Sequence, residues 1–367
     1  MATLQDIADR VGVSKVTVSN VLRGKVQGRG ARTAAQVKRI QAVAEELNYR
    51  VDWRARALKT KRTQMIGLLS MREDHFNLHN EELFLSLLNT LSDRGYSLVL
   101  VKIDPRTHGG TGFDDARFDG LLIDYFITPQ EIEAVQRAKV PALIINAPGI
   151  DCIGSVMPDH RAAGRLAARA LLDLGHRRLA HVRTSEDQRA IWPQHMTAAW
   201  AAGVLDEMRA AGLEDDYTEL TAASAGLNEH ERHYLPLIRS ALASDRPPTG
   251  FIADSGRHAA NGVLRNLTAL GVRCPEDASV LCMEELDGCT WTQPSISALK
   301  TNYTGIGHEA AMRLVDQIEK REARPVDLAF QEPQLIRRES IGPPPDASEP
   351  GTSAQPPRAR KRQLQRG

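Results

Sequence analysis

Apolar residues in the first fifty positions recur at intervals of three and four, which predicts three short helices. Gly12 ends the first helix, because glycine tolerates the left-handed backbone with which helices often stop. Ser14 is suited to cap a second helix over 15–22, and Thr33 is suited to cap a third over 34–47. The apolar stripes of the first and third helices consist of Leu4, Ile7, Ala8, Val11, Val37, Ile40, Val43, Ala44 and Leu47.

The second helix is predicted to turn Val18 and Leu22 toward the first, which leaves the opposite side of its N-terminal half exposed. Lys15, Val16 and Asn20 lie there, and they match the guanine acceptors, the thymine methyl group and the adenine edge of the major groove. Phosphate contacts are expected from Ser14, Thr17, Ser19, Arg23 and Thr33. A three-helix bundle without DNA contacts would show the same stripes, but the tight turn and the basic residues favour a helix-turn-helix.

After Gln64 the pattern changes to short apolar runs that alternate with amphipathic helical stretches. The runs are MIGLLS, SLVLVKI, GLLI, PALIIN, LAHV, TGFIA and SVLCM, with stretches such as RAAGRLAARALLDLG between them. This alternation predicts mostly parallel sheets with helices on both faces, and the number of units predicts two Rossmann-like lobes. The predicted fold is therefore a small all-α helix-turn-helix domain followed by an α/β core.

Four segments follow from these patterns. Residues 1–49 form the headpiece, 50–62 a basic linker and 63–342 the two-lobed core. Residues 343–367 are rich in proline, serine and charge and cannot bury a core, so we expect a disordered basic tail. The tail either serves only solubility or adds a weak, non-specific DNA contact.

Charge is distributed unevenly along the chain, although the formal net charge is only +1. Residues 1–62 contain fourteen lysines and arginines against five acidic residues, a net charge of +9. Residues 343–367 carry +3, which leaves −11 on the core. A basic module attached to an acidic body is typical of nucleic-acid binding, because phosphates attract only the module.

Several classes of protein are disfavoured by composition and motifs. The sequence shows neither a signal-peptide pattern after Met1 nor the ~20 continuous apolar residues of a membrane span, so we expect a cytoplasmic protein. The four cysteines lack metal-ligand spacing, which predicts free thiols, and we expect no metal and no cofactor. There is no G-x-S-x-G, P-loop or dinucleotide-binding motif, and adjacent Glu284 and Glu285 do not resemble opposed catalytic carboxylates. We therefore predict that the protein is not an enzyme.

The string TLQDIADRVGVSKVTVSNVL, with EELNY and RARAL downstream, resembles the LacI family of bacterial regulators. IGLL, DGLLI, PALIIN, GHRRLAHV and LIRRES fit the same family in the same order. The resemblance implies a periplasmic-binding-protein-like core with a small-molecule effector between its lobes. It also implies a homodimeric repressor on a pseudo-palindromic double-stranded DNA operator. The alternative is a solute-binding protein without a regulatory role, which the basic headpiece and the missing export signal oppose.

The resemblance further implies a hinge helix over 52–59 that orders on operator DNA. Leu58 stands at the position that wedges into the minor groove, and Ala55 at the position that packs against the partner's hinge. Val51 and Asp52 replace the proline and asparagine that are usual in the family, which places a negative charge beside DNA.

Effector-contacting positions of the family match His79, Asn80, Asp124, Asn146, Met196, Trp200, Arg257 and Glu285. Met196 replaces an arginine, and Arg257 stands near the position of a ligand-binding aspartate. A register shifted by two residues would instead put Asp254 in that role. The reversed charge predicts an anionic effector held by Arg257, unless that arginine lies on the surface or in a salt bridge. His79 could likewise be a satisfied residue at the edge of the cleft.

Overall fold

The computed structural model divides the chain into two compact units, Met1–Gln64 and Met65–Gly367. The division between headpiece, linker and tail within them stays a prediction, and the tail beyond Pro345 lies outside the described residues. The residues that the structure describes are 2–22, 31–50, 57–58, 60–70, 81–102, 117–124, 129–150, 153–185, 193–223, 230–254, 259–285, 287–319, 327–330 and 333–345.

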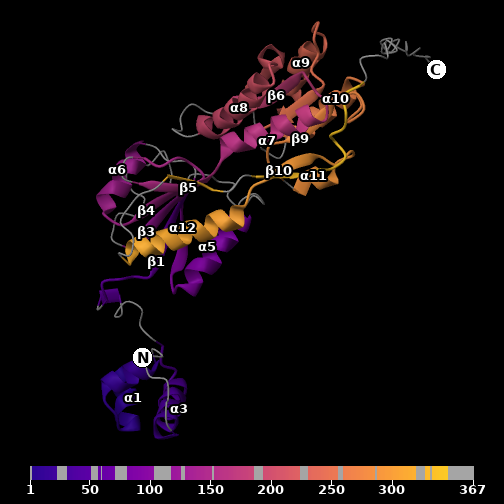
Figure 1. Ribbon diagram of the computed structural model, residues 1–367. Helices are drawn as coiled ribbons and strands as arrows, with labels where there is room; N and C mark the ends of the chain where they lie inside the picture. Colours follow the sequence, from indigo (N-terminus) through magenta and orange to yellow (C-terminus); the bar gives the residue numbers. More distant parts are fainter. Residues whose placement is uncertain are drawn as a thin grey trace, which may run out of the picture. The chain divides into compact units, whose positions relative to one another are not determined.

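The first unit contains α1 (Leu4–Val11), α2 (Lys15–Leu22) and α3 (Ala31–Glu46), which pack around a small apolar core (Figure 1). The turn after α1 follows its prediction, since Gly12 adopts the left-handed conformation with φ 75°. Ser14 caps α2 by accepting a hydrogen bond from the backbone N–H of Thr17 at 3.1 Å. The predicted stripes are confirmed, with Ile7 and Ile40 completely buried.

One detail of the headpiece prediction is wrong. The third helix begins at Ala31, so Thr33 lies inside its first turn instead of capping it. In α2 half-buried Leu22 packs against the core together with Val18, as predicted, and Val21 is also buried there. Val21 lies three residues after Val18, close to one helical turn, and therefore shares its face of the helix.

The first lobe of the second unit is a six-stranded parallel sheet in the order β11-β5-β4-β3-β1-β2. Its strands are β1 (Met65–Ser70), β2 (Ser97–Lys102), β3 (Gly120–Asp124), β4 (Ala142–Ile145), β5 (Gly154–Pro158) and β11 (Asp327–Phe330). Its helices are α5 (Glu81–Asp93), α6 (Pro129–Ala138) and α12 (Tyr303–Ile318). Apolar cores lie on both faces of the sheet, one beneath α5 and α12 and the other beneath α6 (Figure 1).

The second lobe has the sheet order β12-β10-β9-β8-β6-β7, with only β12 antiparallel. Its strands are β6 (Leu179–Ser185), β7 (Tyr217–Ala223), β8 (Gly250–Ala253), β9 (Ser279–Cys282), β10 (Ser297–Lys300) and β12 (Gln334–Ile336). Its helices are α7 (His160–Asp173), α8 (Pro193–Ala210), the 3₁₀ helix η2 (Glu214–Asp216), α9 (His230–Leu242), α10 (Ala259–Ala269) and α11 (Asp287–Trp291). Helices α7 and α8 cover one face, and α9 and α10 the other. The predicted pair of Rossmann-like lobes is thus confirmed.

Helices α7 and α8 cross in backbone contact. A Cβ atom added to Gly164 would lie 2.1 Å from the carbonyl oxygen of Trp200, and one added to Gly203 would lie 2.1 Å from that of Arg161. The pair is also linked by a bidentate ion pair from Arg161 to Asp206. Because only glycine permits this approach, the crossing fixes the position of α8 over β6.

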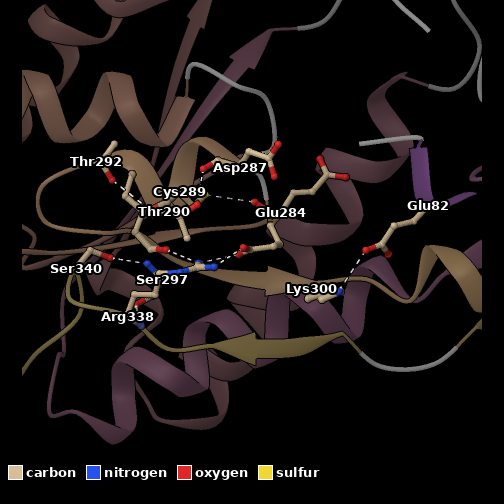
Figure 2. A network of polar contacts seen from close by, with 12 residues as sticks. Glu82, Glu284, Asp287, Cys289, Thr290, Thr292, Ser297, Lys300, Arg338 and Ser340 are labelled. Atoms are coloured by element: carbon tan, nitrogen blue, oxygen red, sulfur yellow. Dashed lines mark hydrogen bonds and ion pairs between the residues drawn. The ribbon is translucent and has the colours of Figure 1, made fainter. Parts of the chain in front are cut away.

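By the order of the described elements, the chain passes between the lobes three times, each time after the carboxyl end of a parallel strand. Strand β5 leads into α7 of the second lobe, β10 leads into α12 of the first, and β11 leads to β12 of the second. The carboxyl ends of both parallel sheets are therefore directed toward the opposite lobe, which is where ligands bind in open α/β sheets. The lobes also touch there, through an ion pair of 3.3 Å between Lys300 and Glu82 (Figure 2) and a hydrogen bond from Tyr303 to Glu284. Among the described helices, none has the length and apolar character to cross a bilayer.

Candidate functional site

The exposed side of α2 carries the residues that were predicted to read bases. Val16 is 68% exposed and Lys15 is exposed, whereas Asn20 is half-buried. The opposite side is anchored, because Val18 is completely buried against α1 and α3. The rotation of α2 about its axis is therefore set by packing, and the helix presents a defined surface.

The residues predicted to contact phosphates lie around this surface. Ser14 is exposed, and its Oγ lies 2.8 Å from the Oγ1 of Thr17. Ser19 and Thr33 are half-buried, and Arg23 lies outside the described residues. All of these DNA contacts stay predictions, since no nucleic acid is part of the structure.

Of the two hinge positions, Leu58 is described and Ala55 is not. Leu58 is helical and 84% exposed, the largest exposure among the large apolar residues of the described chain. Covering such an exposed leucine with a partner is favourable, because it removes apolar surface from water. Its role as a minor-groove wedge stays a prediction.

In the first lobe, two of the predicted effector contacts end neighbouring strands. Asp124 is the last residue of β3, pairs in register with Ile145 of β4, and is buried. Asn146 follows β4 in the left-handed region with φ 63°, which asparagine tolerates better than most residues. Its Oδ1 atom is buried and accepts no hydrogen bond from any described residue. His79 and Asn80, predicted for the same lobe, lie outside the described residues.

In the second lobe, the corresponding strand ends hold a network of which only Asp254 was considered from the sequence. We call it the lobe-two polar cluster, and its members are His181, Arg183, Tyr217, Glu219 and Asp254. His181 and Arg183 are two residues apart on β6 and therefore share a face, and His181 lies opposite Glu219 of β7 in the strand register. Asp254 follows β8 directly and is 1% exposed.

His181 occupies the centre of the lobe-two polar cluster. Its Nε2 atom lies 2.7 Å from Oδ1 of Asp254, and its Nδ1 atom lies 3.1 Å from the hydroxyl of Tyr217. Burial raises the pKa of Tyr217 above its ordinary value, so the hydroxyl keeps its proton. The hydroxyl of Tyr217 also donates to Oε1 of Glu219 at 3.4 Å, and the direction of its hydrogen bond with His181 depends on the tautomer of the imidazole.

Arg183 connects this cluster to α8. It donates from Nη1 to Glu219 at 2.5 Å and from Nη2 to Oγ1 of Thr197 at 3.0 Å. Its Nε atom lies 3.8 Å from Oδ2 of Asp254, and neither of these two buried atoms forms a hydrogen bond with a described residue. A guanidinium and a carboxylate thus meet at the carboxyl ends of β6 and β8 with one donor and one acceptor unused.

Met196 and Trp200, predicted as effector contacts, belong to the apolar core beneath α7 and α8. Trp200 is 3% exposed and meets the ring of His160 edge-on, with centroids 5.6 Å apart. The close crossing of α7 and α8 accounts for this burial. Packing between helices is therefore a sufficient explanation for Trp200, and an effector contact at either residue stays untested.

Glu285 is engaged with Arg338 through a bidentate pair, and Arg338 also donates to the carbonyl oxygen of Ile296 at 2.8 Å. The hydrogen bonds from Arg338 occupy both carboxylate oxygens of Glu285, and the carboxylate raises the pKa of Arg338. This pair ties the segment after β9 to the segment after β12 (Figure 2 shows Arg338 within the network). Arg257 lies outside the described residues.

Comparisons with known proteins agree with this architecture. The model of the LacI family of bacterial regulatory proteins matches residues 3–52, and the model of the periplasmic binding protein-like domain matches residues 155–341. The chain belongs to the LacI family. It is a DNA-binding transcriptional regulator with a two-lobed core, and the matched headpiece favours this role over that of a solute-binding protein.

Curated relatives match almost the whole chain. The transcriptional repressor PurR of Serratia proteamaculans is 26% identical over 353 residues, which cover 93% of this chain and 97% of the relative. The transcriptional regulator CelR of Thermobifida fusca is 26% identical over 354 residues, which cover 91% and 97%. The similarity therefore extends over nearly the full length of both relatives.

Solved structures show the same fold. The complex of CelR with cellobiose superimposes with a TM-score of 0.64 at 24% identity, covering 93% of this chain and 100% of that chain. The lac repressor dimer bound to operator and the anti-inducer ONPF superimposes with a TM-score of 0.71 at 20% identity, covering 93% and 99%.

Proposed function

We propose that this LacI-family protein is a cytoplasmic repressor that binds a pseudo-palindromic operator as a homodimer and responds to a small effector between its lobes. The observation that carries the proposal is the exposed face of α2. Val16 is 68% exposed on a helix whose other side is fixed in a core, within a unit of strongly positive charge. An anchored helix with an exposed N-terminal half is what reading of base edges in the major groove requires. The proposed activity is binding, without a catalytic step.

The relatives support both the repressor role and the binding of a small effector in this proposal. PurR is named as a repressor, and CelR has been solved with cellobiose. A repressor of this architecture would hold its effector between the lobes, at the strand ends that carry Asp124, Asn146 and the lobe-two polar cluster.

Homodimer formation is supported by an apolar surface on the first lobe. Leu85 and Leu88 of α5 are 44% and 38% exposed, and Leu100 of the adjacent strand β2 is 42% exposed. Exposed apolar residues that gather on neighbouring elements commonly mark a protein interface. A second copy of the chain is the occupant we propose, in line with the dimer of the lac repressor structure.

Selection of binding sites from random DNA with the full-length chain tests the proposal. We expect enrichment of one sequence with two inverted half-sites, because a two-fold dimer presents α2 twice. Failure to enrich any sequence would contradict sequence-specific binding, and enrichment of a single half-site would contradict the symmetric dimer.

Sedimentation of the variant Leu88→Glu tests the dimer itself. The substitution places a charge in the proposed apolar interface, so we expect the monomer to predominate where the wild type is dimeric. Asp93→Asn changes an exposed residue at the end of the same helix and is the control, which should remain dimeric. A Leu88→Glu protein that remains dimeric would place the interface elsewhere.

A further inference from the structure

The basic residues that follow the core have no part in the proposed function, which assigns DNA binding to the headpiece. Residues 351–367 contain five lysines and arginines and no acidic residue, a net charge of +5. They lie outside the described residues, but the segment that leads to them is described as far as Pro345. We propose that residues 351–367 bind the phosphates of a second duplex DNA segment, at the end of the core opposite the point where the headpiece is attached.

The direction of the strands defines the two ends of the core. The carboxyl ends of both parallel sheets are directed toward the opposite lobe, so their amino ends lie on the far sides. The core begins at Met65, the first residue of β1, and therefore at the amino end of the first sheet. Strand β12 is antiparallel to β10, so it leads the chain away from the first lobe and toward the amino end of the second sheet.

Hydrogen bonds hold the segment after β12 at that amino end. The Oγ atom of Ser340 accepts from the backbone N–H of Ser297, the first residue of β10, at 2.8 Å (Figure 2). The backbone N–H of Gly342 donates to Oγ of Ser279, the first residue of β9, at 3.0 Å. Gly342 is buried, whereas Pro343 is exposed. The chain therefore leaves the core for solvent directly after Gly342, at a fixed point.

The exit point of the tail and the attachment point of the headpiece thus lie at opposite ends of the core. A compact body of about 280 residues has a radius of gyration of about 19 Å and hence a diameter of about 50 Å. A polypeptide of about 22 residues without regular structure spans about 26 Å on average. The residues after Pro345 therefore do not, on average, reach back to the point where the headpiece is attached.

The composition of residues 346–367 indicates which polyanion they suit. All five cations fall within positions 358–366, and such a cluster attracts phosphates without regard to base sequence. The segment has no aromatic residue on which unpaired bases could stack. Leu364 is its only large apolar residue, which is too little for insertion into a membrane surface. Duplex DNA, the polyanion that regulators of this family bind, is therefore the partner.

The folded end of the core adds positive charge beside the exit point. Arg177 is exposed and follows His176, whose Nε2 atom lies 2.9 Å from the carbonyl oxygen of Gly342. The guanidinium groups of Arg177 and Arg178 donate to backbone carbonyl oxygens, which are uncharged, so both keep their positive charge. Residues 63–342 as a whole carry −11, which repels a duplex from the rest of the core. A second duplex is therefore directed to this end.

Capture of a second duplex by DNA-bound protein tests this inference. The full-length chain is bound to an immobilised duplex that the selection experiment enriched, and a fluorescent duplex of about 40 base pairs and unrelated sequence is added at about 50 mM salt. We expect the wild type to capture the second duplex. A variant without the five charges should capture at least about tenfold less, while its affinity for the selected duplex changes by less than about twofold. This variant combines Arg358→Gln, Arg360→Gln, Lys361→Gln, Arg362→Gln and Arg366→Gln.

A variant that keeps the charge is the matched control. It combines Arg358→Lys, Arg360→Lys, Arg362→Lys and Arg366→Lys, and it should capture the second duplex as the wild type does, because lysine also neutralises phosphates. Thermal unfolding checks that the core is unchanged in both variants. Raising the salt to about 200 mM should reduce capture by about 40-fold when three of the five cations meet phosphates, since each such contact releases counterions.

Several results would overturn the proposal. They are no capture by the wild type, equal capture by the glutamine variant, preference for a single-stranded probe, and an equal loss of affinity for the selected duplex, which would place the tail on the DNA that the headpiece holds. Failure of the selection to enrich any sequence would refute the proposed function instead. Capture is then measured from an immobilised duplex of unrelated sequence, and its loss in the glutamine variant alone would leave this inference standing.

Discussion

The headpiece and the second lobe both carry candidate recognition residues, but they hold these side chains in opposite ways. On α2 the residues Lys15 and Val16 face solvent, and the anchoring is done by apolar residues on the other side of the helix. In the second lobe Arg183 and Asp254 are themselves buried, and hydrogen bonds to Glu219 and His181 hold them in place. Water can form hydrogen bonds with the exposed polar groups on α2, whereas only protein or ligand can do so with the buried groups of Arg183 and Asp254. Substitutions on α2 should therefore alter recognition alone, whereas substitutions around the buried set should also affect folding.

The largest effect that this comparison predicts lies at the crossing of α7 and α8. Gly203→Ala would force a Cβ atom against the carbonyl oxygen of Arg161, so the helices must separate. We expect a loss of about 3 kcal/mol in the stability of the core, measured by guanidinium unfolding. Gly288→Ala is the control, since its Cβ would meet only the amide of Asn261 at 3.3 Å. Equal stability of the two variants would show that the crossing adapts and that the core is not rigid there.

Much of the headpiece could be predicted from sequence because its structure is governed by local spacing. Residues three and four apart share a helix face, and Gly12 and Ser14 mark the turn between α1 and α2. The start of α3 could not be placed, because Thr33 has the side chain of a cap but lies within a run that already favours helix. Strands β1, β2, β3, β4, β6, β8 and β9 followed from their apolar runs in the same way, whereas the shorter strands β5, β10, β11 and β12 were not predicted.

The lobe-two polar cluster could not be predicted, because it is assembled by register between distant strands. His181 and Asp254 are 73 positions apart and meet only once β6 and β8 are paired. The strand β7 was also missed, since YTELTAA lacks an apolar run. Its Tyr217 and Glu219 are polar because they face the cluster, and this alternation of polar residues was the available signal.

The next effect concerns recognition by α2. Asn20→Ala should weaken binding to the selected operator by about 1–3 kcal/mol, because an adenine would lose a bidentate partner. Binding to random DNA should change little, as measured by fluorescence anisotropy at fixed salt. Gln41→Ala, exposed on α3, serves as the control. If operator and random DNA lost equal affinity, Asn20 would be a backbone contact and not a reader of bases.

A smaller effect is the dependence of the stability of the core on pH, which we do not expect to involve the headpiece. His176 is completely buried, with Nδ1 2.9 Å from Oγ1 of Thr249 and Nε2 2.9 Å from the carbonyl oxygen of Gly342. Burial lowers the pKa of His176 below 6.5, so the folded state disfavours its protonation. The contribution of His176 to the free energy of unfolding is fully present above pH 6.5. It decreases as the pH falls from there toward the lowered pKa, because the unfolded chain binds the proton first. The slope for one such group is at most about 1.4 kcal/mol per pH unit.

Thermal unfolding of the core between about pH 7.5 and 5 measures this slope. His176→Gln should lower stability at neutral pH and flatten the dependence on pH, whereas half-buried His233→Gln should leave the slope as it is. An identical slope in His176→Gln would mean that other groups control the acid response.

The smallest effect lies at the N-terminus of the headpiece, where the comparison predicts a change in stability without a change in the core. The side chain of Thr3 accepts from the backbone N–H of Asp6 at 3.3 Å, and Asp6 accepts in return from the backbone N–H of Thr3 at 2.8 Å. Thr3→Ala removes one half of this capping box and should destabilise α1 by about 1 kcal/mol. Thr3→Ser retains the hydroxyl and is the matched control. Hydrogen exchange of the full-length chain follows both units at once, and Thr3→Ala should speed exchange in α1–α3 while β6 and β8 stay unaffected. Faster exchange in both units would mean that headpiece and core unfold together. The two units would then differ only in how they hold their candidate recognition residues, and not in stability.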